Sequence, residues 1–594
     1  MVAKKFPQLD GASVTNIYLF FHRLFSMDYI KTLSILEKTV SAPIYHVIGS
    51  IGGLPLYLST EQGEIALYAL GKESLRLTKG PLANVAKPKA GTDFVPFTRD
   101  LSHGKELHSI NIASLKEQER EIYNARARII SLAYNKEKIA FVSTSGNSGG
   151  LFLEEGGEVR KLTDISPFAS VSDIGNHFIV GEGMLKGNPR ATEIFIAPLD
   201  GGKIDILTPK DGSSNNVFEI RNDTIFFSSD FETGGESSRL YSYNLKDRKY
   251  ESVRFSGQDI IDYNPVEIYS FESENKLVIA GKDGETRIFK DGKFVKAMPG
   301  SQTGATEIGG SIFFSHSSLV STSRIMNADE RGKVSVIVRN THLNMGRAEY
   351  IKIHSDISVP AWLIKPRGRG RRIGIVMVHG GPWSSVINAW DVTISPLVLS
   401  GYTVIAPNFR GSTGYGSNFM QMDINDAGGG DLRDVIAARN YLMDNGIVDH
   451  VGIMGASYGG FMSFLATAKH PELWEFGIPI AGITDWVEMS SMSDPFFKTF
   501  IGMLFGGNID LMKDRSAVNF LENVKVPLCI IHSQNDSRTP LTPVLKYAQK
   551  LHEMNKRFEM HVIPDMGHTI TKMKDIVDLF FPALTFLDRI YGQS

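Results

Sequence analysis

The sequence predicts two kinds of folded domain: an all-β domain built from repeated hairpins, followed by an α/β domain with a doubly wound, mostly parallel sheet. Three observations predict them. Short hairpins recur at even spacing before residue 340, and continuous apolar strands alternate with helices after residue 373. Within this second region, a Gly-x-Ser-x-Gly motif at residues 455–459 follows a strand pattern and precedes a helix pattern.

Length and composition limit the number of domains and the classes of binding partner to expect. A chain of 594 residues is too long for one hydrophobic core, so two or three domains are expected. The charged fraction of 22% and the net charge of −2 give no reason to expect a nucleic-acid or membrane partner. Cys529 is the only cysteine, which excludes an internal disulfide and favours a cytoplasmic location. It lies in an apolar run that predicts a buried strand thiol.

At the N-terminus, an apolar stretch at residues 16–21 is cut short by His22 and Arg23. It is too short to cross a bilayer and lacks a cleavage-site pattern, so we expect neither a membrane span nor a signal peptide. Apolar residues at helical spacing after Met27 predict a helix. Residues 1–44 are therefore interpreted as an extension plus a helix, with the hypothesis that residues 1–26 precede the natural start.

Residues 45–340 carry the repeated hairpins. Five similar pairs of alternating strands occur at residues 107–116, 151–162, 194–207, 240–250 and 287–295. Their spacing of about 43 to 47 residues is typical of the four-stranded blades of a β-propeller, and the length of the region gives roughly seven blades. A pair of β-sandwiches is the alternative, which the even spacing disfavours.

Glu154 and Glu155 lie in one of these hairpins, beside Gly156 and Gly157. Paired glutamates can bind a free N-terminal amine in dipeptidyl peptidases. In a hairpin turn, however, such charges are usually solvated, and this is the interpretation we favour.

Residues 341–594 are predicted to form the α/β domain. Residues 350–365 read as a hairpin, and the basic stretch 367–372 reads as a surface loop because no aromatic residues interleave with its charges. Six apolar strands then alternate with helices. With Ser457 at a strand–turn–helix junction and glycines two residues to either side, this is the pattern of an α/β-hydrolase with a nucleophile elbow.

A serine nucleophile needs a base, and the base needs an orienting carboxylate. His568 lies in a glycine-bearing loop after the last strand, the position of the base in α/β-hydrolases; four other histidines follow Ser457 but lie in strands, helices or at their ends. Asp536 follows a buried strand and precedes His568, as the acid must. Asp565 is the rival, but three residues from His568 it is better suited to shape the turn.

The oxyanion of the tetrahedral intermediate needs backbone donors. One should be the amide after the nucleophile, from Tyr458, and the other should come from the His379–Gly380–Gly381 segment after an earlier strand. His379 is expected to brace that segment. No group of residues has metal-ligand spacing and no phosphate-binding loop is evident, so we expect no metal and no cofactor.

Together, the motifs at residues 379–382, 408–416, 455–460, 535–540 and 565–568 resemble the prolyl oligopeptidase family, and within it the archaeal acylaminoacyl peptidases. The resemblance covers residues 359–584 by motif and the propeller by architecture. It implies Ser457, Asp536 and His568 as the catalytic triad and the amides of Gly381 and Tyr458 as the oxyanion hole. The resemblance further implies that Arg538 binds a substrate carbonyl and that Phe497 and Phe500 form an apolar specificity pocket. Helical spacing also fits these two phenylalanines as ordinary core residues.

The resulting hypothesis is a serine exopeptidase that releases an N-acylated amino acid from short peptides, with side esterase activity. A prolyl-type oligopeptidase or a dipeptidyl peptidase remains the alternative within the family. A carboxylesterase and a non-catalytic propeller that binds proteins are further alternatives. The substrate is then a short N-acylated peptide, and a homo-oligomer is left open.

Overall fold

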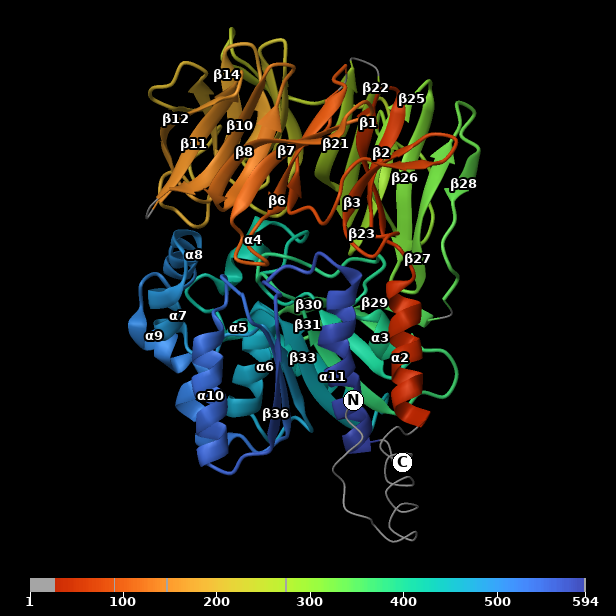
Figure 1. Cartoon of the computed structure of the whole chain (residues 1–594), viewed down its shortest axis with the longest axis vertical. Helices are drawn as coiled ribbons and strands as arrows, with labels where there is room; N and C mark the ends of the chain where they lie inside the picture. Colours follow the sequence, from red (N-terminus) through yellow and green to blue (C-terminus); the bar gives the residue numbers. More distant parts are fainter. Residues whose placement is uncertain (1–26, 90, 146–147, 273–274, 344, 592–594) are drawn as a thin grey trace, which may run out of the picture.

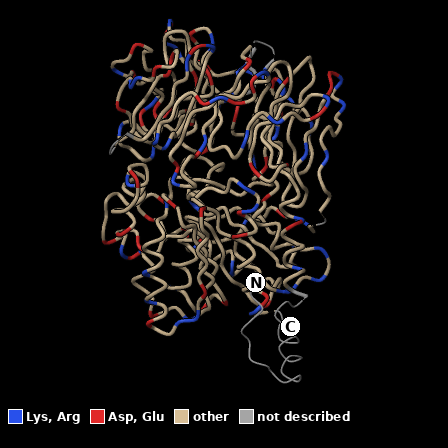
Figure 2. Tube along the Cα trace, viewed as in Figure 1, with Lys and Arg blue, Asp and Glu red and all other residues tan. Residues whose placement is uncertain are grey.

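The computed structural model describes residues 27–89, 91–145, 148–272, 275–343 and 345–591. They form two layers, a propeller stacked on a hydrolase domain (Figure 1). Acidic and basic residues are interspersed over both layers (Figure 2). Within these residues, no helix is both long and apolar enough to cross a membrane. The hypothesis about residues 1–26 lies outside the described residues.

The propeller consists of seven four-stranded antiparallel sheets, as the repeats predict. The sheets are β1–β4 (Tyr45–Ile51, Leu54–Ser59, Ala66–Leu70, Ser74–Arg76), β5–β8 (Asn84–Val85, Phe94–Asp100, His108–Ser114, Gln118–Ala127), β9–β12 (Ile129–Tyr134, Lys138–Ser145, Ser148–Glu155, Glu158–Ile165), β13–β16 (Ala169–Ile174, Phe178–Gly183, Glu193–Pro198, Asp205–Ile206), β17–β20 (Asn215–Arg221, Thr224–Ser229, Arg239–Asn244, Lys249–Ser252), β21–β24 (Asn264–Glu272, Asn275–Lys282, Glu285–Lys290, Lys293–Phe294) and β25–β28 (Ser301–Ile308, Ser311–Ser318, Ser321–Ala328, Val334–Val338). The five hairpins found in the sequence are the third and fourth strands of the second to sixth blades. Successive residues of a blade strand pack against opposite neighbouring blades: Phe195 and Ala197 of β15 join the core shared with the third blade, and Ile194 and Ile196 join the core shared with the fifth.

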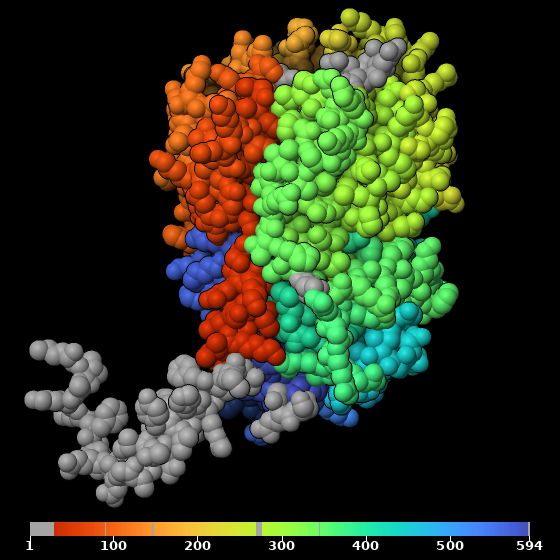
Figure 3. All heavy atoms as spheres, turned by 90° about the vertical axis from the view of Figure 1, so that its right-hand side faces the viewer, coloured from red at the N-terminus to blue at the C-terminus, as the bar shows by residue number. Residues whose placement is uncertain are grey.

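The ring closes between its first and last blades, which meet along one line in Figure 3. Strand β1 packs beside β25, and the hydroxyls of Ser315 and Ser323 accept the backbone N–H groups of Val47 (2.7 Å) and Tyr45 (3.0 Å). Each blade takes its four strands from one continuous stretch of chain. The first and last blades are therefore joined by side chains rather than by an exchanged strand.

Residues 86–89, directly after β5, reach across the middle of the propeller. Lys87 Nζ donates to the carbonyl of Ile268 on β21, in the sixth blade. Lys89 forms an ion pair with Asp173 at the end of β13, in the fourth blade. Pro88 packs on β1 so closely that a Cβ at Gly49 would lie 2.8 Å from it. This segment therefore bridges the central channel that propellers otherwise leave open.

One expectation for the propeller is wrong in part. Glu155 is exposed and pairs with Lys138, as expected of a turn charge. Glu154 is instead only 7% exposed, and its Oε1 accepts the N–H of Gly157 at 2.9 Å. The carboxylate of Glu154 is withdrawn from water because it closes the turn of its own hairpin.

The hydrolase domain is built on an eight-stranded sheet with the order β29-β30-β32-β31-β33-β34-β35-β36. The strands are β29 (Gly346–His354), β30 (Ser358–Pro366), β31 (Ile373–Val378), β32 (Thr403–Pro407), β33 (His450–Ala456), β34 (Gly477–Ile480), β35 (Leu528–Ser533) and β36 (Phe558–Ile563). The pairs β29/β30 and β30/β32 are antiparallel, and all others are parallel. The central strands are buried along their whole length, which explains their continuous apolar sequences.

Helices cover both faces of this sheet. The helical segments are α2 (Met27–Val40), α3 (Ser395–Leu399), α4 (Ser417–Met420), η1 (Gln421–Asp423), α5 (Gly430–Asp444), α6 (Tyr458–Lys469), α7 (Trp486–Met492), α8 (Pro495–Phe505), α9 (Ile509–Asp514), η2 (Ala517–Asn523), α10 (Leu541–Glu553) and α11 (Met573–Tyr591). Helices α5, α6 and α10 share one apolar core, and α2, α3 and α11 share the other. Helix α2 packs along α11, with Tyr29 against Phe581 (5.7 Å between ring centroids).

Candidate active site

The nucleophile elbow is the sharp turn between β33 and α6. Ser457 lies there with φ +58° and ψ −116°. Residues other than glycine rarely adopt this backbone conformation, and where they do, often at functional sites, the backbone is strained. A Cβ at Gly459 would lie 2.0 Å from the carbonyl oxygen of Val378, and one at Gly455 would lie 2.6 Å from the backbone of Gly459. Only glycine fits these positions, which is the physical reason for the Gly-x-Ser-x-Gly pattern.

The three residues expected to form the triad lie within hydrogen-bond distance of one another. Nε2 of His568 is 2.9 Å from Oγ of Ser457, and Nδ1 of His568 is 2.7 Å from Oδ2 of Asp536. They come from three places: the elbow, the loop after β35 and the loop after β36. Asp565 is exposed and adopts φ +54° in the turn before His568.

Asp536 is held in a fully hydrogen-bonded pocket. Its Oδ1 accepts the backbone N–H groups of Arg538 (2.9 Å) and Thr539 (2.8 Å), and its Oδ2 accepts the Thr539 hydroxyl (2.9 Å). Burial alone would raise the pKa of this carboxyl, but the charge and hydrogen bond of His568 outweigh it and lower the pKa to about 2. The acid therefore stays ionised and can stabilise an imidazolium at His568.

The two segments expected to form the oxyanion hole flank Ser457. Tyr458 is the first residue of α6, where backbone N–H groups have no partner within the helix. Its hydroxyl donates to Asp431 Oδ2 at 2.5 Å, which fixes the start of the helix. On the other side, a Cβ at Gly380 would lie 3.4 Å from Cβ of Ser457, so the glycine segment passes directly beside the nucleophile. The neighbouring Gly381 adopts φ +125°, which favours glycine.

His379 braces this glycine segment. Its ring stacks on Phe409 at 4.3 Å, and its Nε2 lies 2.9 Å from Oγ of Ser412. Burial lowers the pKa of His379 to about 4, so the ring stays neutral. The arrangement fits the bracing role expected from the sequence.

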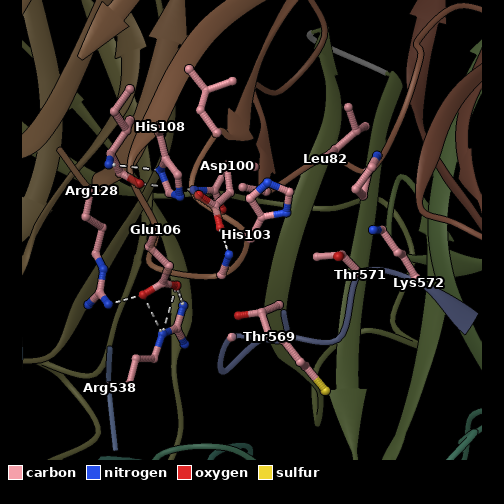
Figure 4. Close-up of a pocket in the computed structure, with 18 of the residues that line it drawn as sticks. Leu82, Asp100, His103, Glu106, His108, Arg128, Arg538, Thr569, Thr571 and Lys572 are labelled. Carbon is pink, nitrogen blue, oxygen red and sulfur yellow. Dashed lines mark hydrogen bonds and ion pairs between the residues drawn. The ribbon is translucent and has the colours of Figure 1, made fainter. Parts of the chain in front are cut away.

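Arg538 lies at the boundary between the two domains and is held by a propeller residue that the sequence did not single out. Its Nε donates to both carboxylate oxygens of Glu106 (3.0 and 3.1 Å), and Arg128 also donates to this carboxylate (Figure 4). The Ser537 hydroxyl is a further donor to Glu106. Arg128 in turn pairs with Asp494 (2.9 Å) at the start of α8. Burial alone would raise the pKa of Glu106, but the two arginines hold it below its usual range. Glu106 therefore carries a charge that is already compensated.

The propeller loop before Glu106 touches both catalytic loops. The carbonyl of His103 accepts Asn535 Nδ2 at 2.9 Å, next to Asp536. A Cβ at Gly104 would lie 2.2 Å from the backbone nitrogen of Gly567, next to His568. The acid and base loops are thus both packed against one loop of the second blade.

A cavity of about 550 Å³ lies beside this contact, between the second blade and the loop that carries His568. It is lined by residues of both domains, including Leu82, His103, Glu106, Arg538 and Thr569 (Figure 4). The cavity reaches the base loop through Gly567 and Thr569, the residues on either side of His568.

The two phenylalanines expected in a specificity pocket lie on α8. Phe500 is 7% exposed and meets Trp383 edge-on at 5.6 Å, whereas Phe497 is partly buried, with the Arg128 guanidinium 5.5 Å from its ring centre. The phenylalanine that lines the cavity is Phe496, which stacks on Phe168 of the propeller at 4.3 Å. No local pattern distinguishes Phe496 from its neighbours Phe497 and Phe500 in the sequence.

Comparisons with known proteins agree with this architecture. Residues 56–326 match a family model described as an acylamino-acid-releasing enzyme-like N-terminal domain, and residues 389–594 match that of the prolyl oligopeptidase family. Human acylamino-acid-releasing enzyme is 28% identical over 231 residues, and dipeptidyl aminopeptidase BIII of Pseudoxanthomonas mexicana is 28% identical over 230 residues. Each match covers 37% of this chain but only 31% and 33% of the relative, so the chain aligns with about a third of the length of these proteins.

Solved structures resemble the chain over nearly its whole length. Pyrococcus horikoshii acylaminoacyl peptidase superposes with a TM-score of 0.70 at 18% identity, covering 94% of this chain and 97% of the other. A Mycobacterium tuberculosis puromycin-hydrolyzing peptidase gives a TM-score of 0.75 at 17% identity, covering 94% and 96%. At this level of identity the likeness establishes the fold.

Proposed function

We propose that this protein is a serine peptidase that releases an N-acylated amino acid from the N-terminus of short peptides; the match of residues 389–594 to the prolyl oligopeptidase family model supports the proposal. The observation that carries the proposal is the hydrogen-bonded chain from Ser457 through His568 to Asp536. A side esterase activity follows from the same chemistry, because an ester presents the same carbonyl with a better leaving group.

In the proposed mechanism, Ser457 Oγ attacks the carbonyl of the first peptide bond while Nε2 of His568 takes its proton. Asp536 keeps the imidazole in the tautomer that accepts this proton. The amides of Gly381 and Tyr458 stabilise the oxyanion, a contribution of about 2.7–4 kcal/mol for each donor. His568 then protonates the leaving amine, and water activated by His568 hydrolyses the acyl-enzyme.

The charge of Glu106 supports an acylated rather than a free N-terminus. A free amine would need an uncompensated carboxylate, and Glu106 is already paired with Arg538 and Arg128. Glu154, the other glutamate considered, closes a hairpin turn in the third blade. An uncharged acyl group needs no such partner, and Arg538 is placed to donate to a substrate carbonyl.

A dipeptidyl peptidase is the second candidate, because a carboxylate, that of Glu106, is present at the domain boundary even though two arginines pair with it. This carboxylate lies beside Arg538, so an incoming ammonium group could compete with the arginine for it. The same triad would then remove two residues instead of one acylated residue. Substrate preference separates the two functions.

The propeller supports the restriction to short peptides. Residues 86–89 bridge its central channel, and the cavity at the domain boundary holds about 550 Å³, room for only a few residues. The single cysteine supports our further proposal of a cytoplasmic location.

Three matched substrates test the proposal: an N-acetylated peptide, the same peptide with a free amine, and a blocked peptide with an internal proline. We expect the acetylated peptide to be cleaved fastest, after its first residue, and Ser457→Ala to abolish turnover while leaving the fold intact. Preference for the free amine would support the dipeptidyl peptidase, and preference for proline the prolyl-type enzyme. Hydrolysis of esters alone would indicate a carboxylesterase.

A further inference from the structure

A second group of reactive side chains lies at the edge of the hydrolase sheet, away from the triad. The parallel strands β35 and β36 pair Cys529 with Glu559 and Ile531 with His561. Residues two apart in a strand project from the same face, so Cys529, Glu559 and His561 share one face of the sheet. The sequence spacing predicts no such cluster, because Cys529 and Glu559 are 30 residues apart and only strand pairing brings them together.

The ligand atoms of the three residues are already close together. Sγ of Cys529 lies 3.4 Å and Nε2 of His561 lies 3.1 Å from Oε1 of Glu559, and all three atoms lie within 4.8 Å of one another. Around a tetrahedral zinc ion, sulfur, nitrogen and oxygen ligands are separated by about 3.3–3.6 Å, as follows from the usual metal–ligand distances. An ion can therefore be seated among them by side-chain adjustments alone.

The charges around the cluster leave one carboxylate oxygen for an ion. Arg589 on α11 pairs with Oε2 of Glu559, while Oε1 faces the sulfur and the imidazole. An outer partner of this kind orients a metal-binding carboxylate. Glu559 compensates Arg589, and a thiolate at Cys529 would compensate part of the charge of the ion.

Burial differs among the three ligands in a way that suits a site with access from solvent. Cys529 is fully buried, whereas the side chains of Glu559 and His561 are 27% and 36% exposed. An ion can thus reach the sulfur from the side of His561, where water can complete its coordination. The set of one sulfur, one nitrogen and one oxygen ligand suits Zn²⁺ or Co²⁺ rather than Mg²⁺ or Ca²⁺.

We propose that Cys529, Glu559 and His561 form a binding site for a borderline-soft divalent cation of the Zn²⁺ class. On binding, the thiol proton of Cys529 leaves to solvent as the metal–sulfur bond forms, and the His561 imidazole binds in its neutral form. The ion would join the edge strand β36 to β35. These are the two strands that lead into the loops of His568 and Asp536, so the site would stabilise the sheet beneath the acid and the base.

The test is titration of the tag-free, metal-stripped full-length protein with Co²⁺, followed by absorption spectroscopy. A tetrahedral site with a cysteine ligand should give an intense near-ultraviolet thiolate-to-cobalt band that saturates at one equivalent and is removed by Zn²⁺. Cys529→Ser should abolish the band, and His561→Gln should weaken Co²⁺ binding at least tenfold. Zn²⁺ should also raise the midpoint of thermal unfolding of the unmodified protein.

His552→Gln is the matched control, because His552 is exposed on α10 and outside the cluster. It should bind Co²⁺ like the unmodified protein. His561→Gln changes a partly exposed side chain, so it remains informative if Cys529→Ser fails to fold. Absence of the thiolate band, or a band that persists unchanged in His561→Gln, would overturn the proposal. The result is independent of peptidase activity.

Discussion

Glu106, Arg538 and Arg128 form a charge cluster at the domain boundary, and substitution of Glu106 tests what this cluster does. Glu106→Gln keeps the size of the side chain but removes the charge that Arg538 and Arg128 share. Arg128 keeps its ion pair with Asp494 at 2.9 Å. The side chain of Arg538 is 33% exposed, so water can replace part of the hydrogen bonding that it loses. Breaking a fully buried ion pair costs about 3–5 kcal/mol. With these compensations, we expect the free energy of unfolding to fall by about 2–3 kcal/mol.

The same substitution should change substrate binding. The Glu106 carboxylate accepts from Nε and Nη2 along one edge of the Arg538 guanidinium, and without it the arginine is no longer fixed for a substrate carbonyl. We expect KM for the N-acetylated peptide to rise about tenfold, equivalent to about 1.4 kcal/mol, with a much smaller change in kcat. The assay is steady-state hydrolysis at saturating and subsaturating peptide, combined with denaturant unfolding of the same preparation.

Glu119→Gln is the matched control. Glu119 pairs with Arg99 in the same blade, with a similar low exposure, but it does not line the cavity. It should lower stability without altering KM. The reasoning is refuted if Glu106→Gln leaves KM unchanged, or if Glu119→Gln raises it equally, because the effect would then be one of general stability.

Three further predictions follow from the site and its surroundings. The pKa of Asp536 is lowered from 3.8 to about 2, so its stabilising contribution of about 2 kcal/mol is present above pH 4 and lost as the pH falls towards 2; Asp536→Asn should remove this part of the acid dependence of unfolding. Gly104→Ala would push against the base loop and should lower kcat at least tenfold, whereas Gly212→Ala, at a similarly left-handed but open position, should not. A bulky maleimide on Leu101→Cys, at the cavity, should block peptide hydrolysis, whereas the same label on the exposed Asp93→Cys, which does not line this cavity, should leave hydrolysis intact. The native Cys529 is buried, so the label should react with the introduced cysteine.

Each of these predictions has an outcome that contradicts it. An unchanged acid transition in Asp536→Asn would mean that the carboxyl is not held ionised by its partners. Equal kcat values for Gly104→Ala and Gly212→Ala would mean that the contact between the propeller loop and the base loop does not affect catalysis. Peptide hydrolysis that survives the label at Leu101 but not the label at Asp93 would mean that the substrate does not use the cavity at the domain boundary.

The fold was predictable because the hydrophobic periodicity of each strand and helix can be read within a short stretch of the sequence. The alternation at residues 240–250, for example, is the outer hairpin of a blade, and the apolar run of β35 is a strand buried on both faces. Ser457, Asp536 and His568 could be chosen for the same reason, since each follows its own strand and the carboxyl ends of parallel strands meet at one edge of the sheet.

The contacts that sequence reasoning missed join distant segments. Glu106 and Arg538 are 432 residues apart and meet only because the second blade lies over the acid loop. The bridging role of Lys87 depends on a strand of the sixth blade, 181 residues away. No local pattern distinguishes Glu106 from the other glutamates of the propeller, because its burial is created by the packing of the two domains.

The most direct test of the central claim compares kcat/KM for an N-acetylated peptide with that for the same peptide bearing a free amine, on one preparation of the protein and on its Ser457→Ala variant. The account predicts preferential cleavage of the acetylated peptide after its first residue, and no cleavage of either peptide by the variant. Preferential release of dipeptides from the free-amine substrate would contradict it, and cleavage by Ser457→Ala would mean that the nucleophile lies elsewhere.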